Sequence, residues 1–280
     1  METTTSSSGV AVVTDSTADL PGDLAGKHGL TVVPLQVVLG GRVCSDGVDV
    51  SPGDVAAALA AGTSVSTSQP TPAAFAAAYQ AAADAGARAV VSVHISSQLS
   101  GTVASARLAA AQAPGIRVRV VDSATAAMGL GFAALAAAEA AATGQAVDAV
   151  EWAAVRTAGR TRVLIYVDAL EYLRRGGRIG TAASRLGPAL VVKPPLHSAD
   201  GQVVADKARS HLVDLALQTA GCGPVEIAVE HLAAAKHAER VASALRAHVG
   251  ELRALHIGPI GAVVGAHLGP GALIVVVSPA

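Results

Sequence analysis

One segment of the chain predicts its architecture: AVVSVHISSQLSGT, residues 89–102, followed by VASARLAAAQA, residues 103–113. The β-branched residues at its start predict a buried strand over 89–93, and the alanine-rich run predicts a helix. The hydroxyl-rich residues between them form a loop at the carboxyl end of the strand, where open α/β sheets bind ligands. Unpaired backbone N–H groups and the dipole of the following helix favour an anion there.

The same arrangement of strand, polar loop and helix occurs twice more along the chain. Residues 10–13 (VAVV) lead into TDSTADLP at 14–21, and residues 118–121 (VRVV) lead into DSAT at 122–125. Three such units predict parallel strands whose polar loops share one edge of a sheet. We therefore expect the ligand site at that edge.

A fourth polar stretch, TSVSTSQPTP over residues 63–72, precedes another alanine-rich helix. Thr71 is the expected N-cap of this helix and Pro72 its first residue. Thr67 and Ser68 are then left just ahead of the helix, where their hydroxyl groups are candidate ligand contacts.

Composition bounds the class of protein. A length of 280 residues predicts about two domains, and 51% apolar residues are ample for a packed core. A net charge of −1 gives no overall attraction to nucleic acid or to an anionic membrane. Two cysteines cannot form a disulfide framework, residues 1–8 are too polar for a secretory signal, and no apolar run is long enough to span a bilayer. We expect a soluble cytoplasmic protein.

The pattern changes between residues 145 and 160, after which hairpins are expected in place of parallel crossovers. The sequence predicts helices over 147–160, 169–175 and 233–248, strands over 161–167, 225–231, 252–257 and 273–277, and a hairpin of 190–196 with 202–207 around the Asp-Gly turn at 200–201. The expected fold class is therefore α/β, with a parallel-sheet domain over 1–155, a mixed or antiparallel α+β domain over 156–280, and the ligand between them.

Several motifs have an ordinary structural explanation. GLGFAA at 129–134 fits G-x-G-x-x-A, but it begins well past the strand, so we favour a role in helix packing. The sequence contains no G-x-x-x-x-G-K-[ST] phosphate loop and no G-x-S-x-G nucleophile elbow, and Ser100 has no base at a motif spacing. The nine histidines never occur at metal-ligand spacings, so no metal site is expected.

Two segments of the second half are functional candidates. His267 lies in GAVVGAHLGPG, residues 261–271, where glycines let the backbone approach a ligand and the imidazole offers a hydrogen bond; an ordinary loop histidine is the alternative. RRGGRIGT at 174–181 could be a solvated helix end or, with Arg185, imitate a helix-turn-helix. The neutral net charge favours an acidic partner or a phosphate over DNA.

These motifs occur in the order seen in the DegV family, which the chain resembles from residue 10 to residue 277. They are TDS at 14–16 with DLP at 19–21, TSQP at 67–70, SSQLSGT at 96–102, LEYLRRGGRI at 170–179, KP at 193–194, KAR at 207–209 and GAHLGPG at 265–271. The resemblance implies a two-domain α/β protein that holds one long-chain fatty acid between its domains. In some bacteria it presents the fatty acid to a separate kinase, which makes acyl phosphate for phospholipid synthesis.

The resemblance also implies roles for individual residues. Those expected near the fatty-acid carboxylate are Thr67, Ser68, Ser96, Ser97, Ser100, Gly101 and His267, and those expected at the surface that faces the kinase are Arg178 and Arg209. Val103 and residues 44–45 stand where many members have aromatic residues, which leaves the preferred acyl chain open.

A polar mouth over an apolar tunnel suits such a ligand, because each buried methylene contributes about 0.8 kcal/mol. We expect a carrier with no catalytic residue, cofactor or metal, which binds no nucleic acid and makes transient contact with a membrane surface. Two alternatives remain open. One is a small-molecule kinase subunit or hydrolase of related fold, and the other is a nucleic-acid-binding regulator that uses Arg174, Arg175, Arg178 and Arg185.

Overall fold

The first sheet is fully parallel, with strand order β2-β1-β6-β7. The computed structural model describes residues 9–113, 115–177, 190–192 and 201–280. The four strands are β1 (Val10–Asp15), β2 (Leu30–Val33), β6 (Ala89–His94) and β7 (Arg117–Asp122). The register pairs Val12 of β1 with Val91 of β6, and His94 with Asp122 of β7. The expected parallel sheet is confirmed, and its polar loops follow adjacent strands on one edge.

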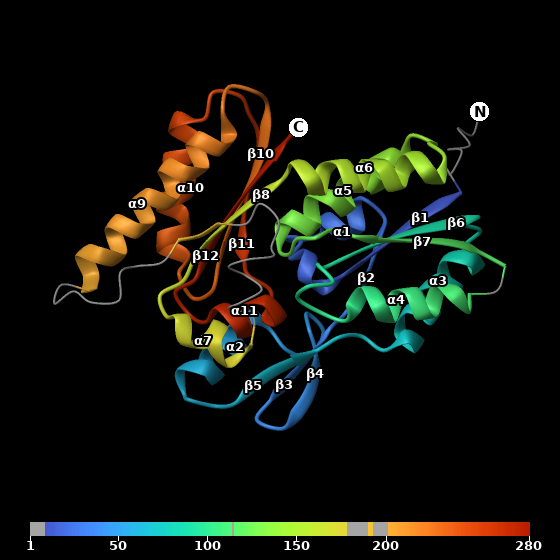
Figure 1. Ribbon diagram of the computed structural model, residues 1–280, viewed down its shortest axis with the longest axis horizontal. Coiled ribbons are helices and arrows are strands. Elements are labelled where there is room, and N and C mark those ends of the chain that lie inside the picture. The colour runs from blue at the N-terminus through green and yellow to red at the C-terminus, as the bar shows by residue number, and fades with distance from the viewer. Residues whose placement is uncertain (1–8, 114, 178–189, 193–200) are drawn as a thin grey trace.

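Helices cover both faces of this sheet, which is why every residue of β6 is buried. Figure 1 shows α3 (Pro72–Asp84) and α4 (Thr102–Ala111) on one side, and α5 (Met128–Ala142) and α6 (Val147–Arg160) on the other. Short helices η1 (Ser16–Ala18) and α1 (Leu24–Lys27) follow β1.

The second sheet is mixed, with strand order β11-β10-β12-β8-β9. Its strands are β8 (Arg162–Tyr166), β9 (Leu190–Val192), β10 (Val225–His231), β11 (Leu252–Pro259) and β12 (Leu273–Pro279). β12 runs antiparallel to both β10 and β8, whereas β10 with β11 and β8 with β9 are parallel pairs. Helices α9 (Gly201–Ala220) and α10 (Ala235–His248) cover one face, and α5 packs toward the other.

A third, small sheet joins the two halves of the chain. Its antiparallel strands are β3 (Gln36–Leu39), β4 (Arg42–Ser45) and β5 (Val65–Ser68), in the order β4-β3-β5. Helices α2 (Pro52–Ala60) and α11 (Ala262–Leu268) share a core with it. Thr67 and Ser68 therefore lie on a strand and not in the loop that the sequence predicted. The alternation of residues 65–68 suits a strand that pairs with β3.

The predicted hairpin around residues 200–201 is wrong, because residues 201–220 form one helix, α9. Leu212, Ala216 and Ala220 recur every fourth residue and are buried against the second sheet, so helical packing overrides the local strand pattern. Residues 193–200, which include the first residue of the predicted Asp-Gly turn, lie outside the described residues, as does Arg185, which was considered for a helix-turn-helix.

The expected division between residues 155 and 156 stays a prediction. It falls inside α6, which runs from Val147 to Arg160 and packs on α5. Both halves of the chain contribute to the core around α5, so the two sheets face each other across that helix.

Candidate functional site

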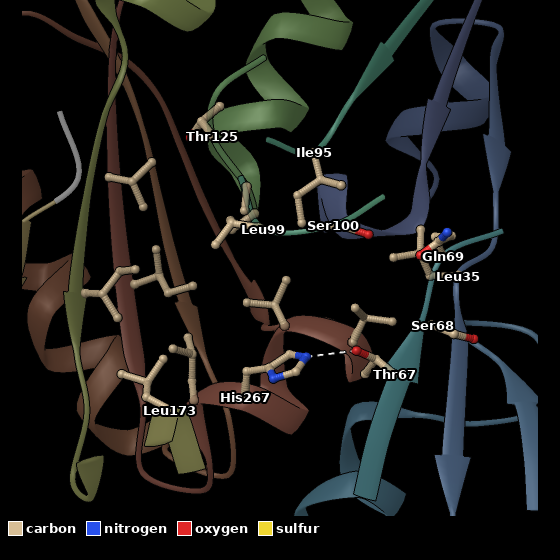
Figure 2. Close-up of a pocket in the computed structure, with 18 residues that line it drawn as sticks. Leu35, Thr67, Ser68, Gln69, Ile95, Leu99, Ser100, Thr125, Leu173 and His267 are labelled. Atoms are coloured by element: carbon tan, nitrogen blue, oxygen red, sulfur yellow. Dashed lines mark hydrogen bonds between the residues drawn. The ribbon is translucent and has the colours of Figure 1, made fainter. Parts of the chain in front are cut away.

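A pocket lies where the edge of the first sheet that carries the polar loops meets the second and third sheets (Figure 2). The cavity itself has a volume of about 110 Å³. Twelve of its lining residues are apolar: Leu35, Ile95, Leu99, Ala126, Ala127, Val163, Ile165, Leu173, Val263, Val264, Leu268 and Ile274. The six polar ones are Thr67, Ser68, Gln69, Ser100, Thr125 and His267.

The two halves of the chain meet at one hydrogen bond on the pocket wall. Thr67 Oγ1 of β5 lies 2.8 Å from His267 Nε2 of α11, although the residues are 200 positions apart in sequence (Figure 2). Both side chains are half-buried. A hydroxyl group and an imidazole can each donate or accept a hydrogen bond, so this pair gives the wall of a mostly apolar pocket a polar contact.

Four of the residues that the sequence placed near the carboxylate line the pocket, namely Thr67, Ser68, Ser100 and His267. Ser100 Oγ lies 2.8 Å from Thr102 Oγ1, at the start of α4. Thr67 and His267 are in direct contact, whereas Ser68 is exposed on the same strand.

The other three residues predicted for the carboxylate are not among those that line the pocket. Ser96 is buried, and its Oγ accepts the N–H of Gln98 at 3.2 Å. Ser97 is exposed, and its N–H donates to Asp122. Gly101 packs on the side chain of Gln69, where an added Cβ would lie 2.8 Å from the amide.

Sequence reasoning missed two polar residues of the pocket, Gln69 and Thr125. Gln69 follows Thr67 in the TSQP motif, and Thr125 ends the polar loop after β7. Thr125 could have been inferred from the rule that loops at one edge of a parallel sheet converge, and Gln69 from its place directly after Thr67 and Ser68.

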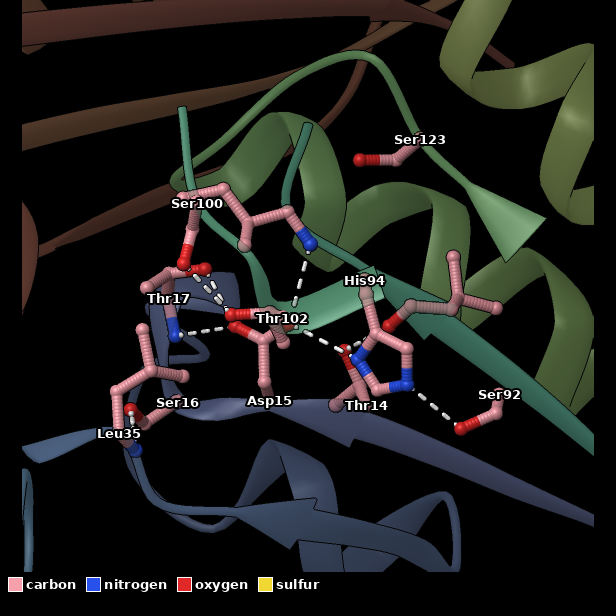
Figure 3. A network of polar contacts seen from close by, with 12 residues as sticks. Thr14, Asp15, Ser16, Thr17, Leu35, Ser92, His94, Ser100, Thr102 and Ser123 are labelled. Atoms are coloured by element: carbon pink, nitrogen blue, oxygen red, sulfur yellow. Dashed lines mark hydrogen bonds and ion pairs between the residues drawn. The ribbon is translucent and has the colours of Figure 1, made fainter. Parts of the chain in front are cut away.

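A buried network fixes the start of the loop over 94–102 (Figure 3). Asp15 Oδ2 accepts the N–H of Ile95 at 3.0 Å and lies 3.0 Å from His94 Nδ1. His94 Nε2 lies 2.6 Å from Ser92 Oγ, which in turn contacts the hydroxyl of Tyr79 at 2.9 Å.

This Ser-His-Asp sequence of contacts resembles a hydrolase triad in its order, but all three side chains are fully buried. A nucleophile must reach a substrate, so the network holds the fold together here. Burial also raises the pKa of Tyr79 to about 12, which keeps its hydroxyl protonated as a donor. The network anchors Ile95, which lines the pocket.

Three buried carboxyl groups lie at the starts of α11 and α5. Asp46 Oδ1 accepts the N–H of Ala262 at 3.2 Å, and Glu230 Oε2 accepts that of Met128 at 3.2 Å. Burial raises the pKa of Asp46, and burial together with repulsion from Glu230 raises that of Asp19 well above its usual range. Burial raises the pKa of Glu230 to about 8. The common cause is desolvation, because buried charge is costly.

The two arginines expected at a kinase-facing surface differ in what the structure describes. Arg178 lies outside the described residues. Arg209 lies on α9 and not beside a hairpin, and 13% of its side chain is exposed. Its Nη2 donates to Asp168 Oδ1 at 3.2 Å, and its guanidinium carbon is 5.1 Å from the centroid of the Tyr166 ring. The expected surface position is thus corrected to a largely buried one, because Asp168 supplies an acidic partner.

Two further observations concern the residues that the structure describes. They contain no cluster of three or more histidine, cysteine or acidic side chains that could hold a metal ion. Within the same ranges, no helix has the length and apolar character needed to cross a bilayer.

Comparison with known proteins places this geometry in context. Residues 9–280 match a family profile described as "Uncharacterised protein, DegV family". A DegV domain-containing protein of Streptomyces coelicolor is 48% identical over 276 residues, which cover 96% of this chain and 98% of the relative.

Two solved structures share the fold along nearly the whole chain. "Fatty Acid Binding of a DegV family Protein from Thermus thermophilus" has a TM-score of 0.84 and 31% identity, and the match covers 97% of this chain and 99% of that one. "Crystal Structure of DegV, a fatty acid binding protein from Bacillus subtilis" has a TM-score of 0.82 and 29% identity, with the same coverage of each chain. The similarity therefore includes the elements that line the pocket.

Proposed function

The chain belongs to the DegV family, and from this premise we propose that it binds one long-chain fatty acid in the pocket between its sheets. The observation that carries the proposal is the Thr67–His267 pair on the wall of a mostly apolar pocket. The structures from Thermus thermophilus and Bacillus subtilis, whose descriptions state fatty-acid binding, support it.

The carboxylate head group binds at Thr67 and His267 in this proposal. An ionised carboxylate that leaves water needs several donors, because an unpaired buried charge is very costly. While Thr67 Oγ1 and His267 Nε2 are bonded to each other, the pair offers one donor. Both groups can donate once the carboxylate replaces their mutual hydrogen bond and Nε2 carries a proton, and Ser68, Gln69 and Ser100 line the same pocket. Hydrogen bonds to a charged group are about twice as strong as those between neutral groups, so this cluster favours the acid over a neutral lipid.

The acyl chain occupies the apolar part of the pocket. Ile95 and Leu99 come from the first half of the chain, and Val163, Ile165 and Ile274 from the second sheet. Each methylene that leaves water contributes about 0.8 kcal/mol, so a long chain supplies most of the affinity while the head group supplies orientation.

We also propose that the protein acts in the cytoplasm as a carrier and presents the fatty acid to a separate kinase that forms acyl phosphate, with transient contact at a membrane surface. The family resemblance suggests this role, and the sequence contains no phosphate-loop motif for ATP. Arg178 and Arg209 stay predicted determinants of the kinase step. The fully buried Ser92, His94 and Asp15 give no support to the hydrolase alternative.

Native mass spectrometry of gently purified protein tests the fatty-acid proposal. We expect a species with one bound fatty acid, which denaturation in organic solvent releases for identification. Protein stripped of lipid should take up one equivalent of hexadecanoic acid. If the protein neither carries a fatty acid nor takes up the added acid, the proposal is wrong.

A further inference from the structure

Helix α7 (Leu170–Arg175) packs against α11, and two glycines just after α11 lie against Tyr172 of α7 and against Asp168, which precedes α7. Gly269 and Gly271 have φ of +80° and +87°, in the left-handed region that favours glycine. A Cβ at Gly269 would lie 2.1 Å from the ring of Tyr172, and one at Gly271 would lie 2.0 Å from the carboxylate of Asp168. The segment's backbone is thus held directly against these two side chains.

A third contact of the same kind involves the head-group site itself. A Cβ at Gly176, just after α7, would lie 2.3 Å from His267 Nδ1. The opposite ring nitrogen, Nε2, lies 2.8 Å from Thr67 Oγ1. The imidazole is therefore confined between Gly176 on one side and Thr67 on the other. Any side chain at position 176 would push the ring away from its present place.

Asp168, at the other end of this interface, is itself held from two directions. It accepts hydrogen bonds from the Tyr166 hydroxyl and from Arg209 Nη2. The Arg209 guanidinium also lies over the Tyr166 ring, which is fully buried. A continuous set of contacts therefore joins Arg209 on α9, through Asp168, to Gly271, four residues from His267.

We propose that Gly176 and Asp168 are positioning residues for the head-group site: they hold the His267 imidazole in the orientation that a carboxylate needs, and Arg209 acts on binding through Asp168. This inference rests on the proposed function, because it concerns the same site. It differs from direct recognition, since none of these three residues lines the pocket.

Gly176→Ala tests the inference with Gly159→Ala as the matched control. Gly159 is an exposed residue of α6 with no atom within 4 Å of an added Cβ. The probes are hexadecanoic acid and hexadecan-1-ol, which share a chain and differ in the carboxylate. We expect Gly176→Ala to weaken binding of the acid by about tenfold or more, as for one lost hydrogen bond to a charged group, and to leave binding of the alcohol unchanged. Gly159→Ala should change neither.

Two further measurements separate positioning from general damage. In a His267→Ala background, Gly176→Ala should cause no additional loss of affinity for hexadecanoic acid, because the imidazole ring through which it acts is absent. In ligand-free protein, the ¹⁵N shifts of the His267 ring should change in Gly176→Ala and stay as in wild type in Gly159→Ala. Three results would each overturn the inference. They are unchanged ring shifts in Gly176→Ala, an equal loss of affinity for the acid and the alcohol, and a further loss of affinity for the acid when Gly176→Ala is added to His267→Ala.

The same logic applies to Arg209. Arg209→Ala should weaken binding of hexadecanoic acid in the wild-type background but not in an Asp168→Ala background, with thermal unfolding recorded for each variant. If Arg209→Ala lowers the affinity for hexadecanoic acid equally in both backgrounds, Arg209 does not act through Asp168. If the wild-type protein binds neither probe, the proposed function is wrong. The ¹⁵N shifts of the His267 ring in ligand-free protein would still test whether Gly176 positions that ring.

Discussion

At the scale of single residues, the contact between Thr67 and His267 joins two of the six polar residues that line the pocket. Each side chain comes from an element whose other residues are largely apolar or face elsewhere, and the two meet only when α11 packs under β5. The roles proposed for them at the carboxylate lead to the first prediction.

His267→Ala and Thr67→Val should each weaken hexadecanoic acid binding by about 1–3 kcal/mol, the cost of one lost hydrogen bond to a charged group. Titration calorimetry on lipid-free protein measures this directly. Ser97→Ala should leave the affinity unchanged, because Ser97 is exposed and is not among the residues that line the pocket. An effect of Ser97→Ala equal to that of His267→Ala would move the head group to the loop over 94–102.

Glu230 leads to a prediction about pH. Burial raises its pKa to about 8, against 4.5 for an ordinary glutamate. Between these values the unfolded chain has released a proton that the folded chain keeps, so the free energy of unfolding falls as pH rises through this window. Glu230→Gln retains an oxygen that can accept the Met128 N–H and does not ionise.

The free energy of unfolding of the Glu230→Gln variant should therefore fall less steeply as pH rises than that of the wild-type protein. We expect the smallest difference from wild type at pH 5 and a clear gain in stability at pH 9, measured from denaturant midpoints. Parallel curves for the two proteins across this range would show that Glu230 is ionised in the folded state.

At the scale of elements, α5 is the helix that joins the two sheets. Twelve of its fifteen residues are buried, and its glycines permit the close approach. A Cβ at Gly131 would lie 2.6 Å from the carbonyl oxygen of Ala18 and 2.7 Å from the sulfur of Met128. These contacts support the interpretation of GLGFAA as a helix-packing motif.

Gly131→Ala should lower the free energy of unfolding by about 1–3 kcal/mol, because the backbone oxygen of Ala18 cannot move away cheaply. The same substitution at exposed Gly159, in the neighbouring helix α6, should stabilise by about 0.5–1 kcal/mol through the helix propensity of alanine. Urea denaturation measures the free energy of unfolding of both variants. Equal changes in the two would mean that α5 can move away from Ala18 without a loss of stability.

The sequence analysis predicted the elements whose pattern is local. The β-branched runs of β1, β6 and β7, each followed by a polar loop and a helix, indicated a parallel sheet. β6 in the interior is buried along its whole length, whereas β7 lies at the edge of the sheet and is mostly half-buried. The hairpin over 190–207 was wrong, since what makes α9 helical is its packing on the second sheet. The small sheet was missed because β3, β4 and β5 have four residues each and depend on one another.

The candidate site was predictable to a similar extent. The family resemblance placed Thr67 and His267 near the same carboxylate, but their direct contact depends on the packing of α11 against β5, and no spacing in the sequence reveals it. The serines of SSQLSGT were placed together at the carboxylate, whereas local loop contacts turn Ser96 inward and leave Ser97 at the surface.

At the scale of the whole molecule, the pocket belongs to neither half of the chain alone. Its walls come from the loops of the first sheet, from β8 and β12 of the second, and from α11, which packs with the third (Figure 1). Such a site between sheets can enclose an acyl chain and needs no catalytic group of its own.

We therefore predict that the purified protein forms no acyl phosphate from hexadecanoic acid and ATP alone. Trapping with hydroxylamine would detect the product, and a mixture containing a fatty acid kinase serves as the positive control. Turnover by the protein alone would contradict the carrier role.

The central claim is that the fatty-acid carboxylate lies between β5 and α11. A crystal structure with hexadecanoic acid tests it most directly. We predict a carboxylate within hydrogen-bonding distance of Thr67 Oγ1 and His267 Nε2, with the acyl chain along Ile95, Ile165 and Ile274. A carboxylate bound elsewhere, or a pocket that stays empty at saturating ligand, would contradict the account.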